Sequence, residues 1–338
     1  MGLTIYDISE KAGVSIATVS RVLNESSNVS DKTRQKVLDV IEASGYTPNV
    51  FARGLGLDTM KTIGILCADS SDMYLAKAVY YLEQLLRQDS YDTILCCTGY
   101  EQERKKSCME LLLSKRVDGI ILCGSNFLQD SEEDNLYIRE AAGQIPIMLL
   151  NAEYDCNNVY SVFCDDLKSM QTVTNRMITS GHEDILYLYN SHSASAKRKL
   201  DGFIAGLNSC SLPVREEYLC FYDGSHEDIE EMVSFIQRAA DSGLHFNGII
   251  ASEDALGVAA VKYANRAGMR IPEELSIIGY NNSLLAKCCD PELSTVDNQI
   301  ETLCKALVRI LISVLNGEHA PQKSVFSGEL VERGTTGH

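Results

Sequence analysis

The sequence predicts an α/β protein in which an all-helical module at the amino terminus precedes a larger core built on parallel sheets. Three short amphipathic segments, separated by glycine or serine, occupy residues 1–48. From Thr62 onward, strand-length apolar runs alternate with amphipathic stretches of helical length, which is typical of strand–helix–strand units in parallel sheets. A chain of 338 residues is too long for one small core, so we expect two or three domains.

The composition is that of a soluble globular protein, with 45% hydrophobic and 23% charged residues. The longest apolar runs, such as IPIMLL, have the length of a strand and are too short to span a bilayer. The opening MGLTIYDISE contains acidic residues and differs from a signal segment, so we expect a cytoplasmic protein without membrane contact. Twelve cysteines occur without a CxxC pair, and we interpret them as reduced thiols and expect no metal or cofactor.

The net charge of −17 is unevenly distributed along the chain. Residues 1–60 contain six Lys or Arg and seven Asp or Glu, whereas the remaining residues contain 24 and 40. Such acidity argues against a protein that coats nucleic acid indiscriminately. The nearly neutral first sixty residues nevertheless permit contact with DNA at one end of the chain.

The second helix of the amino-terminal module has a small and polar outer face. The first helix, within TIYDISEKAG, ends at Gly13, and Ser15 can cap the second helix, within VSIATVSRVLN. At helical periodicity, Val19 and the apolar residues one turn later share one side, whereas Ala17 and Arg21 point away from it. The helix is therefore suited to approach another molecule closely.

A third helix is predicted between a cap at Ser30 and Gly45, and Pro48 prevents its continuation. Three such helices with a tight glycine turn form a helix-turn-helix arrangement. Geometry alone leaves two interpretations open. The module either inserts its second helix into the major groove of DNA or is an ordinary helical cap on a larger domain.

Residues 49–60 form the predicted linker between the module and the core. Asn49 can cap a helix over 50–57, but a helix this short is not stable alone. Gly54 and Gly56 each weaken it by about 1 kcal/mol relative to alanine. Composition by itself therefore indicates a flexible linker.

Ten strands are predicted in the core, and amphipathic helices separate most of them. One twisted sheet seldom holds so many strands, so we expect two subdomains that face each other across a cleft. The strand segments are TIGILC, TILCC, GIILC, IPIMLL, SVFC, DILYLY, YLCFY, GIIAS, LSIIGY and STVD. The helical segments include residues 73–88, 101–115, 166–180, 227–243, 255–267 and 298–316.

Polar side chains follow the predicted strands, at the sheet edge where parallel sheets bind ligands. Each one alone is explained as well by a turn or a helix cap, but their convergence at one rim favours a site for a polyhydroxylated ligand. They are Asp69, Ser70, Ser71, Asp72 and Tyr74 after the first strand, Ser125, Asn126 and Phe127 after the third, and Asn151, Asn190, Ser191, Glu253, Asp254, Asn281 and Asn282 after later strands.

The segments TIYDISEKAGVSIATVSRVLN and VSDKTRQKVLDVIEASGYTPNVFARGLG closely resemble the headpiece of the LacI/GalR family of bacterial transcription regulators, and the similarity continues to about residue 334. The resemblance implies a helix-turn-helix DNA-binding headpiece at 1–48, a hinge helix at 49–60 and an effector-binding core at 61–336. It implies that the core has a type I periplasmic-binding-protein fold of two parallel, doubly wound subdomains, one of about 61–161 and 290–320 and the other of about 162–289 and 321–336.

The same resemblance assigns DNA contacts to the headpiece. Ile16, Ala17 and Arg21 take the positions that read base edges, where arginine offers a bidentate fork to guanine and the other two offer only apolar contact. The positions that touch or approach phosphates in the family are Thr4, Ser15, Thr18, Ser20, Asn24, Val29 and Thr33 in this chain.

The segment ARGL aligns with the hinge helix of the family, which folds on the operator and pairs with its dimer mate in the minor groove. Leu55 takes the position of the leucine that opens the central base step, and Ala52 and Arg53 lie beside it. An apolar wedge in the minor groove kinks DNA at a cost of a few kcal/mol, which added contacts offset.

The chain departs from its family at the effector site. The anchoring arginine of the family motif RxxGF is Lys199 in KLDGF, and lysine cannot reproduce a bidentate guanidinium. Asn281 replaces a carboxylate, Glu253 replaces an Asn or Ser, and Asn151 stands where Asp is frequent. These differences leave open an atypical sugar, a nucleoside-like or amine-bearing molecule, or no small molecule at all.

The resemblance implies a sequence-specific transcriptional regulator, a repressor that binds a pseudo-palindromic operator as a homodimer under the control of a sugar-like effector. The first alternative keeps the DNA-binding role but replaces the effector by a protein co-regulator or by no ligand. A solute-binding receptor is a remote alternative. No enzyme is expected, because GxGxxG, Walker and nucleophile-elbow motifs are absent from the sequence and its six histidines are scattered.

Overall fold

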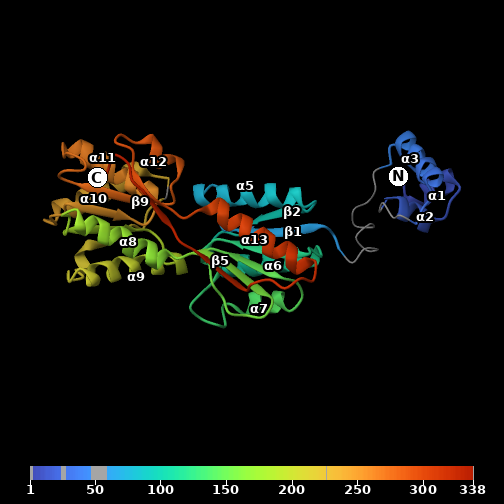
Figure 1. Cartoon of the computed structure of the whole chain (residues 1–338), viewed down its shortest axis with the longest axis horizontal. Helices are drawn as coiled ribbons and strands as arrows, with labels where there is room; N and C mark the ends of the chain where they lie inside the picture. Colours follow the sequence, from blue (N-terminus) through green and yellow to red (C-terminus); the bar gives the residue numbers. More distant parts are fainter. Residues whose placement is uncertain (1–2, 24–27, 47–58, 226, 338) are drawn as a thin grey trace.

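The computed structural model describes residues 3–23, 28–46, 59–225 and 227–337. Within them, three helices precede a core of two six-stranded sheets with helices on both faces (Figure 1). The predicted fold class, an α/β core behind an all-helical headpiece, is therefore confirmed. The headpiece helices are α1 (Ile5–Ala12), α2 (Ile16–Leu23) and α3 (Asp31–Ser44).

The headpiece helices begin and end where local chemistry predicts. α1 ends at Gly13, whose φ of 58° is left-handed, and α3 ends in the same way at Gly45. The hydroxyls of Ser15 and Ser30 accept backbone N–H bonds at the first turns of α2 and α3. A small core of Ile8, Ala12, Val19, Val22 and Val37 holds the three helices together.

The first sheet has the strand order β11-β5-β4-β3-β1-β2, and its strands are all parallel. Helices α5 and α13 pack on one face, and α6 and α7 pack on the other (Figure 1). The strands are β1 (Thr62–Cys67), β2 (Asp92–Cys97), β3 (Gly119–Cys123), β4 (Ile147–Leu150), β5 (Val159–Cys164) and β11 (Lys323–Phe326). The helices are α5 (Met73–Gln88), α6 (Gln102–Ser114), α7 (Leu136–Ala142) and α13 (Ile300–Leu315), with a 3-10 turn, η1, at Ser125–Phe127.

The second sheet has the order β12-β10-β9-β8-β6-β7, with only the β10–β12 pair antiparallel. Helices α10, α11 and α12 cover one face, and α8 and α9 cover the other. The strands are β6 (Ile185–Tyr189), β7 (Leu219–Phe221), β8 (Gly248–Ala251), β9 (Ser276–Tyr280), β10 (Ser294–Asp297) and β12 (Glu329–Val331). The helices are α8 (Asp166–Thr179), α9 (Ala194–Ser209), α10 (Ile229–Asp241), α11 (Asp254–Ala267) and α12 (Leu284–Cys288), with a 3-10 turn, η2, at Glu216–Tyr218.

The subdomain boundaries differ from the predicted ones at the places where the chain changes sheet. In the described core the chain passes between subdomains after β5, after β10 and after β11. The prediction placed β10 with the first subdomain, but this strand pairs with β9 of the second. The prediction also placed β11 and the end of β5 with the second subdomain, but these two strands pair with each other in the first sheet. The sheet to which such a strand belongs is decided by its hydrogen-bond partners elsewhere in the chain. The sequence of the strand itself does not reveal these partners.

Two glycines of α9 allow it to pack closely against α8. A Cβ atom at Gly202 would lie 2.2 Å from the carbonyl oxygen of Leu167, and one at Gly206 would lie 2.5 Å from Cβ of Thr174. These distances are shorter than van der Waals contact, so α9 meets the backbone of α8 at Gly202 and the side chain of Thr174 at Gly206. The contact sets the position of α9, whose first turns face the cleft described below.

We expect Gly202→Ala to lower the free energy of unfolding by about 3 kcal/mol, because the added methyl group overlaps backbone that has no room to move. Urea denaturation monitored by circular dichroism measures the change. Asn208→Ala, at an exposed position of the same helix, is the control and should change stability by less than about 0.5 kcal/mol. Equal effects of the two substitutions would contradict the close packing.

Candidate functional site

Helix α2 has three exposed side chains, of which Ala17 and Arg21 point away from its buried face and Ile16 lies at its flank. Val19 and Val22 are 0% and 3% exposed in the headpiece core. Ile16 and Ala17 at the start of the helix are exposed, as is Arg21 one turn later. A partner can therefore approach these three side chains without any change in the headpiece core. The outward orientation predicted for Ala17 and Arg21 is present, and the reading of bases by all three side chains remains a prediction.

Several residues predicted to approach phosphates lie at the first turns of the headpiece helices. The N–H and hydroxyl groups of Thr4 both donate to Oδ2 of Asp7 at 2.7 Å, and these bonds hold the pKa of the Asp7 carboxyl below its usual value. The hydroxyls of Ser15 and Thr18 pair at 2.9 Å, and that of Thr33 pairs with its N-cap serine at the same distance. These hydroxyls thus stabilise the helix ends that would face the DNA backbone.

The remaining headpiece predictions divide into two groups. Ser20 and Val29 are half-buried at the edge of the helices. Asn24, Ala52, Arg53 and Leu55, and with them the hinge helix predicted at 49–60 apart from its last two residues, lie outside the described residues. The sequence reasoning did not single out Tyr6, whose side chain on the first turn of α1 is 68% exposed. Helical periodicity already places Tyr6 away from the apolar face of Ile5, Ile8 and Ala12, so the sequence could have indicated its exposure.

A cleft between the two subdomains contains two adjoining cavities, of about 350 Å³ and 510 Å³. They share Asp72, Tyr74 and Tyr100 from the first subdomain and Glu253 and Asn281 from the second. The cleft lies beyond the carboxyl ends of strands in both sheets, as in other open α/β sheets. Its volume is within the range of pockets for small organic ligands.

The structure brings together most of the residues predicted at the strand ends. The first cavity is lined by Asp72, Tyr74, Ser125, Asn126, Asn151, Asn190, Lys199, Glu253 and Asn281, and the second adds Asp69, Ser71 and Asp254. Ser70, predicted with its neighbours, is exposed and lines neither cavity. Their convergence is a geometric finding, and their contact with an effector remains a prediction.

Sequence reasoning missed part of the cleft wall. Tyr100 follows β2 by three residues and lines both cavities, a position that the rule of strand ends indicates. Ser193 and Ser195 come from the first turn of α9, a helix that was not predicted. Ser225 and Glu227 precede α10 and line the second cavity.

Lys199, the residue in place of the family's arginine, lies at the wall of the first cavity but is engaged by the protein. Its Nζ donates to the carbonyl oxygen of Ser252 at 2.9 Å and lies 3.9 Å from the ring centre of Tyr280. Burial lowers the pKa of this ammonium group, and the carboxylates of Asp166 and Glu253 oppose that shift. The protein therefore uses one N–H donor of this ammonium group, and the group also lies against the Tyr280 ring.

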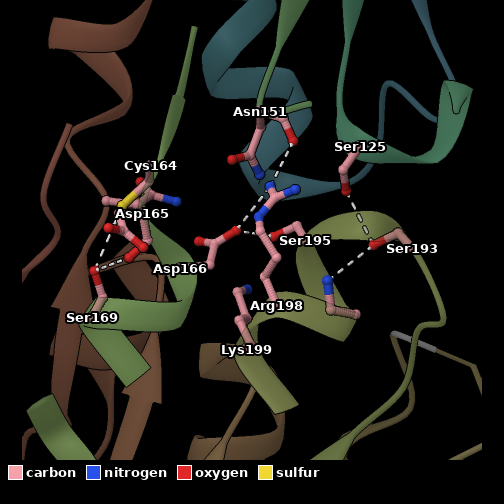
Figure 2. Close-up of polar contacts among 12 residues, drawn as sticks. Ser125, Asn151, Cys164, Asp165, Asp166, Ser169, Ser193, Ser195, Arg198 and Lys199 are labelled. Atoms are coloured by element: carbon pink, nitrogen blue, oxygen red, sulfur yellow. Dashed lines mark hydrogen bonds and ion pairs between the residues drawn. The ribbon is translucent and has the colours of Figure 1, made fainter. Parts of the chain in front are cut away.

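The adjacent Arg198 reaches from the second subdomain to the end of β4 in the first, and it also contacts a buried carboxylate of its own subdomain (Figure 2). Asp166, at the start of α8, is 1% exposed, and its carboxylate accepts hydroxyl hydrogen bonds from Ser195 at 2.6 Å and Tyr280 at 2.8 Å. Arg198 lies 3.4 Å from the same carboxylate and 3.4 Å from the carbonyl oxygen of Asn151, at the end of β4. We name Asp166, Ser195, Arg198, Tyr280 and Asn151 the junction network.

A second contact crosses the cleft near the junction network. The hydroxyl of Ser125, in the 3-10 turn of the first subdomain, donates to the hydroxyl of Ser193 at 3.0 Å (Figure 2). Ser193 also caps α9 by accepting the N–H of Ala196. Both serines line the first cavity, so the contact that spans the two subdomains lies at the candidate ligand site.

Two further properties concern the described part of the chain. It contains no helix that is long and apolar enough to cross a membrane. It also contains no group of three or more His, Cys, Asp and Glu side chains arranged to hold a metal ion.

Comparison with known families and proteins agrees with this architecture. Residues 4–49 match the bacterial regulatory proteins of the lacI family, and residues 174–336 match a periplasmic binding protein-like domain. The chain is 50% identical over 334 residues to an HTH-type transcriptional regulator of Lachnoclostridium phytofermentans, with 99% of each chain covered. It is 28% identical to catabolite control protein A of Priestia megaterium, with 94% of each covered.

Solved structures show the same fold. The lac repressor dimer bound to operator and the anti-inducer ONPF superposes with a TM-score of 0.86 at 23% identity, covering 99% of each chain. The CelR–cellobiose complex gives a TM-score of 0.71 at 23% identity, covering 99% of this chain and 100% of the other. A helix-turn-helix headpiece on such a core defines a DNA-binding transcriptional regulator. The chain belongs to the LacI/GalR family of these regulators.

We expect Asp166→Asn to lower the free energy of unfolding by about 3 kcal/mol, because it leaves Arg198 without its buried counter-charge and disturbs two hydroxyl bonds. Asp165→Asn is the matched control, since Asp165 caps α8 through the N–H of Lys168 and asparagine caps nearly as well. Urea titration of both variants measures the difference. Equal stability of the two variants would show that the junction network does not stabilise the protein.

Proposed function

We propose that this protein is a repressor that binds a pseudo-palindromic operator as a homodimer and is controlled by a small polar effector in the cleft. The observation on which the proposal chiefly depends is the cleft itself, because polar side chains from both subdomains converge on the same cavities. A ligand that contacts both walls binds one relative position of the subdomains more tightly than another, which is the physical requirement for allosteric control.

The operator contact is proposed for the exposed face of α2. Ile16 and Ala17 are small or apolar, so they admit close approach to base edges and contact with a thymine methyl group, while Arg21 offers two donors to one guanine. The predicted hinge residues Ala52, Arg53 and Leu55 would add a minor-groove contact, as the family resemblance implies. The headpiece has few cations, so we expect non-specific affinity for DNA to be weak at physiological salt.

The effector role is supported by relatives with the same fold. Structures named as complexes include CelR with cellobiose and the lac repressor with ONPG. In this chain, Ser125 and Ser193 meet across the cleft, and Arg198 reaches across the junction network beside it. A ligand that displaces or strengthens these contacts would change the relative position of the subdomains, and through them the spacing of two headpieces in a dimer. We infer a regulatory and not a catalytic role for the cleft.

Exposed apolar side chains support the proposed dimer. Tyr80 on α5 is 59% exposed, and Leu284 on α12 is 66% exposed. α5 and α12 lie on the same side of the core in Figure 1. Large apolar side chains gathered on one side of a surface are typical of a protein–protein contact. We propose that this side of the core meets its copy in the dimer.

Arg21→Ala should weaken binding to the selected operator by about 1–3 kcal/mol and relax the preference at one base pair in each half-site. The operator is obtained by selection from random duplexes with the intact protein, and affinities are then measured on operator and scrambled DNA. Arg21→Lys keeps the charge but loses the bidentate fork, so it should restore non-specific binding without restoring the base preference. An equal loss on both duplexes would show that Arg21 contacts phosphate alone.

Tyr80→Asp should raise the dissociation constant of the dimer by about 30-fold, because a buried aromatic contact is replaced by a charge. Sedimentation velocity over a range of protein concentrations measures this change. Leu111→Asp is the control, since Leu111 is 47% exposed on α6, which packs on the other face of the first sheet. A monomeric parent protein, or an equal effect of both variants, would contradict the proposed surface.

A further inference from the structure

The ionisable side chains of the cleft are mainly acidic. Among the described residues that line the two cavities, Asp69, Asp72, Glu227, Glu253 and Asp254 are carboxylic acids, and Lys199 is the one cation. The ammonium group of Lys199 is already bonded to the carbonyl oxygen of Ser252 and lies over the ring of Tyr280. An anionic ligand would therefore enter a region of unfavourable potential.

Two of these carboxylates lie on opposite walls and belong to both cavities. Asp72 is the N-cap of α5 in the first subdomain and accepts the N–H of Leu75 at 2.8 Å. Glu253 precedes α11 in the second subdomain and accepts the side-chain N–H of Asn190 at 2.6 Å. Tyr100 also lines both cavities: burial raises the pKa of its phenol, and the charges of Asp72, Asp69 and Glu253 raise it further. The electrostatic influence of both walls thus converges near one aromatic ring.

An independent observation shows that the first cavity has hydrogen-bond acceptors in need of donors. Asn151 is 7% exposed, and its side-chain oxygen has no hydrogen-bond partner among the described residues. The side-chain oxygen of Asn126 and the hydroxyl of Tyr74 are also buried without a partner in that part of the chain. All three residues line the first cavity. A buried acceptor without a partner is costly, so these atoms indicate a ligand that supplies donors to them.

A protonated amine has the chemistry that the carboxylates favour, and hydroxyl groups on the same ligand can donate to the unpartnered oxygens. The amine provides three donors and no acceptor, and it carries the positive charge that opposing carboxylates favour. Aromatic rings such as those of Tyr74 and Tyr100 add attraction for a cation near their faces. A phosphate group has the opposite properties, because it is anionic and only accepts hydrogen bonds at neutral pH.

We propose that the effector is a polyhydroxylated molecule with a protonated amine, of the amino-sugar class, held between Asp72 on one wall and Glu253 on the other, with its hydroxyls bonded to Asn126 and Asn151. This inference rests on the proposed function, since it gives a ligand class to the same cleft. It also explains why a lysine that is bonded to the protein suffices where the family has an arginine. The effector brings its own positive charge to the site.

The test measures binding of matched ligands to the full-length protein by thermal shift and calorimetry. The probes are glucosamine, galactosamine, mannosamine and the β-1,4-linked glucosamine dimer, each beside its N-acetyl derivative, its neutral parent sugar and, for the monomers, its 6-phosphate. We expect at least one free amine to bind 10-fold or more tightly than its N-acetyl and neutral counterparts, and its 6-phosphate to bind more weakly still. A panel in which no amine shows this preference, or in which a phosphate ester binds best, would overturn the proposal.

Charge-removing variants then test the two carboxylates with the amine that binds. Asp72→Asn retains an N-cap for α5, and Glu253→Gln retains the acceptor for Asn190, so both should keep the parent melting temperature. Each should weaken binding of the amine by about 10-fold and change binding of its neutral counterpart by less than 3-fold. Glu318→Gln, at an exposed position after α13, is the control and should leave both affinities unchanged. Equal losses for the amine and neutral ligands would contradict the charge assignment.

Operator binding separates this inference from the proposed function. A neutral sugar that binds in the cleft and alters operator affinity would overturn the amine assignment and support effector control. An amine that binds in the predicted manner without any effect on operator affinity would support the ligand class and contradict effector control.

Discussion

The buried carboxylate of Asp166 is the constraint on which the geometry of the core depends. It lies just after β5, where the chain first passes from one subdomain to the other. A carboxylate that is 1% exposed is tolerated only when its oxygens are bonded, and the donors come from Ser195 on α9 and Tyr280 on β9, with Arg198 nearby. These bonds hold the first turns of α9 against the crossover, and the same turns form the wall of the cleft.

This arrangement connects ligand binding with the relation between the subdomains. Ser193, Ser195 and Lys199 line the first cavity, while Arg198 on the same helix reaches the carbonyl oxygen of Asn151 in the other subdomain. A ligand in the cavity therefore contacts the same helix that holds the subdomains together. Because packed interfaces change between discrete arrangements, small differences in ligand contact can be converted into a change of subdomain position. In the proposed dimer, a change in the spacing of the two headpieces would be enough for the exposed face of α2 to gain or lose its operator.

Much of the candidate site could be predicted from the sequence because the carboxyl ends of parallel strands share one edge. This rule predicts Asp72, Asn126, Asn151 and Glu253 from the sequence alone, and all four line the first cavity. It failed for the serines of α9, because the helix begins with small polar residues and contains two glycines that dilute its amphipathic pattern. Those glycines are required by the close approach of α8, which is a property of the packed pair and not of either helix alone.

The sequence by itself determined the elements whose causes are local: the headpiece helices with their serine caps and glycine ends, the apolar strands, and the family to which the chain belongs. Only the tertiary structure decided which sheet receives β10 and β11, which oxygens of the cleft lack partners, and that Lys199 is bonded to the protein while Arg198 spans the junction network. The physical reason is range. Capping and periodicity act over a few residues, whereas pairing of strands and burial of charge join residues more than a hundred positions apart, such as Asp166 and Tyr280.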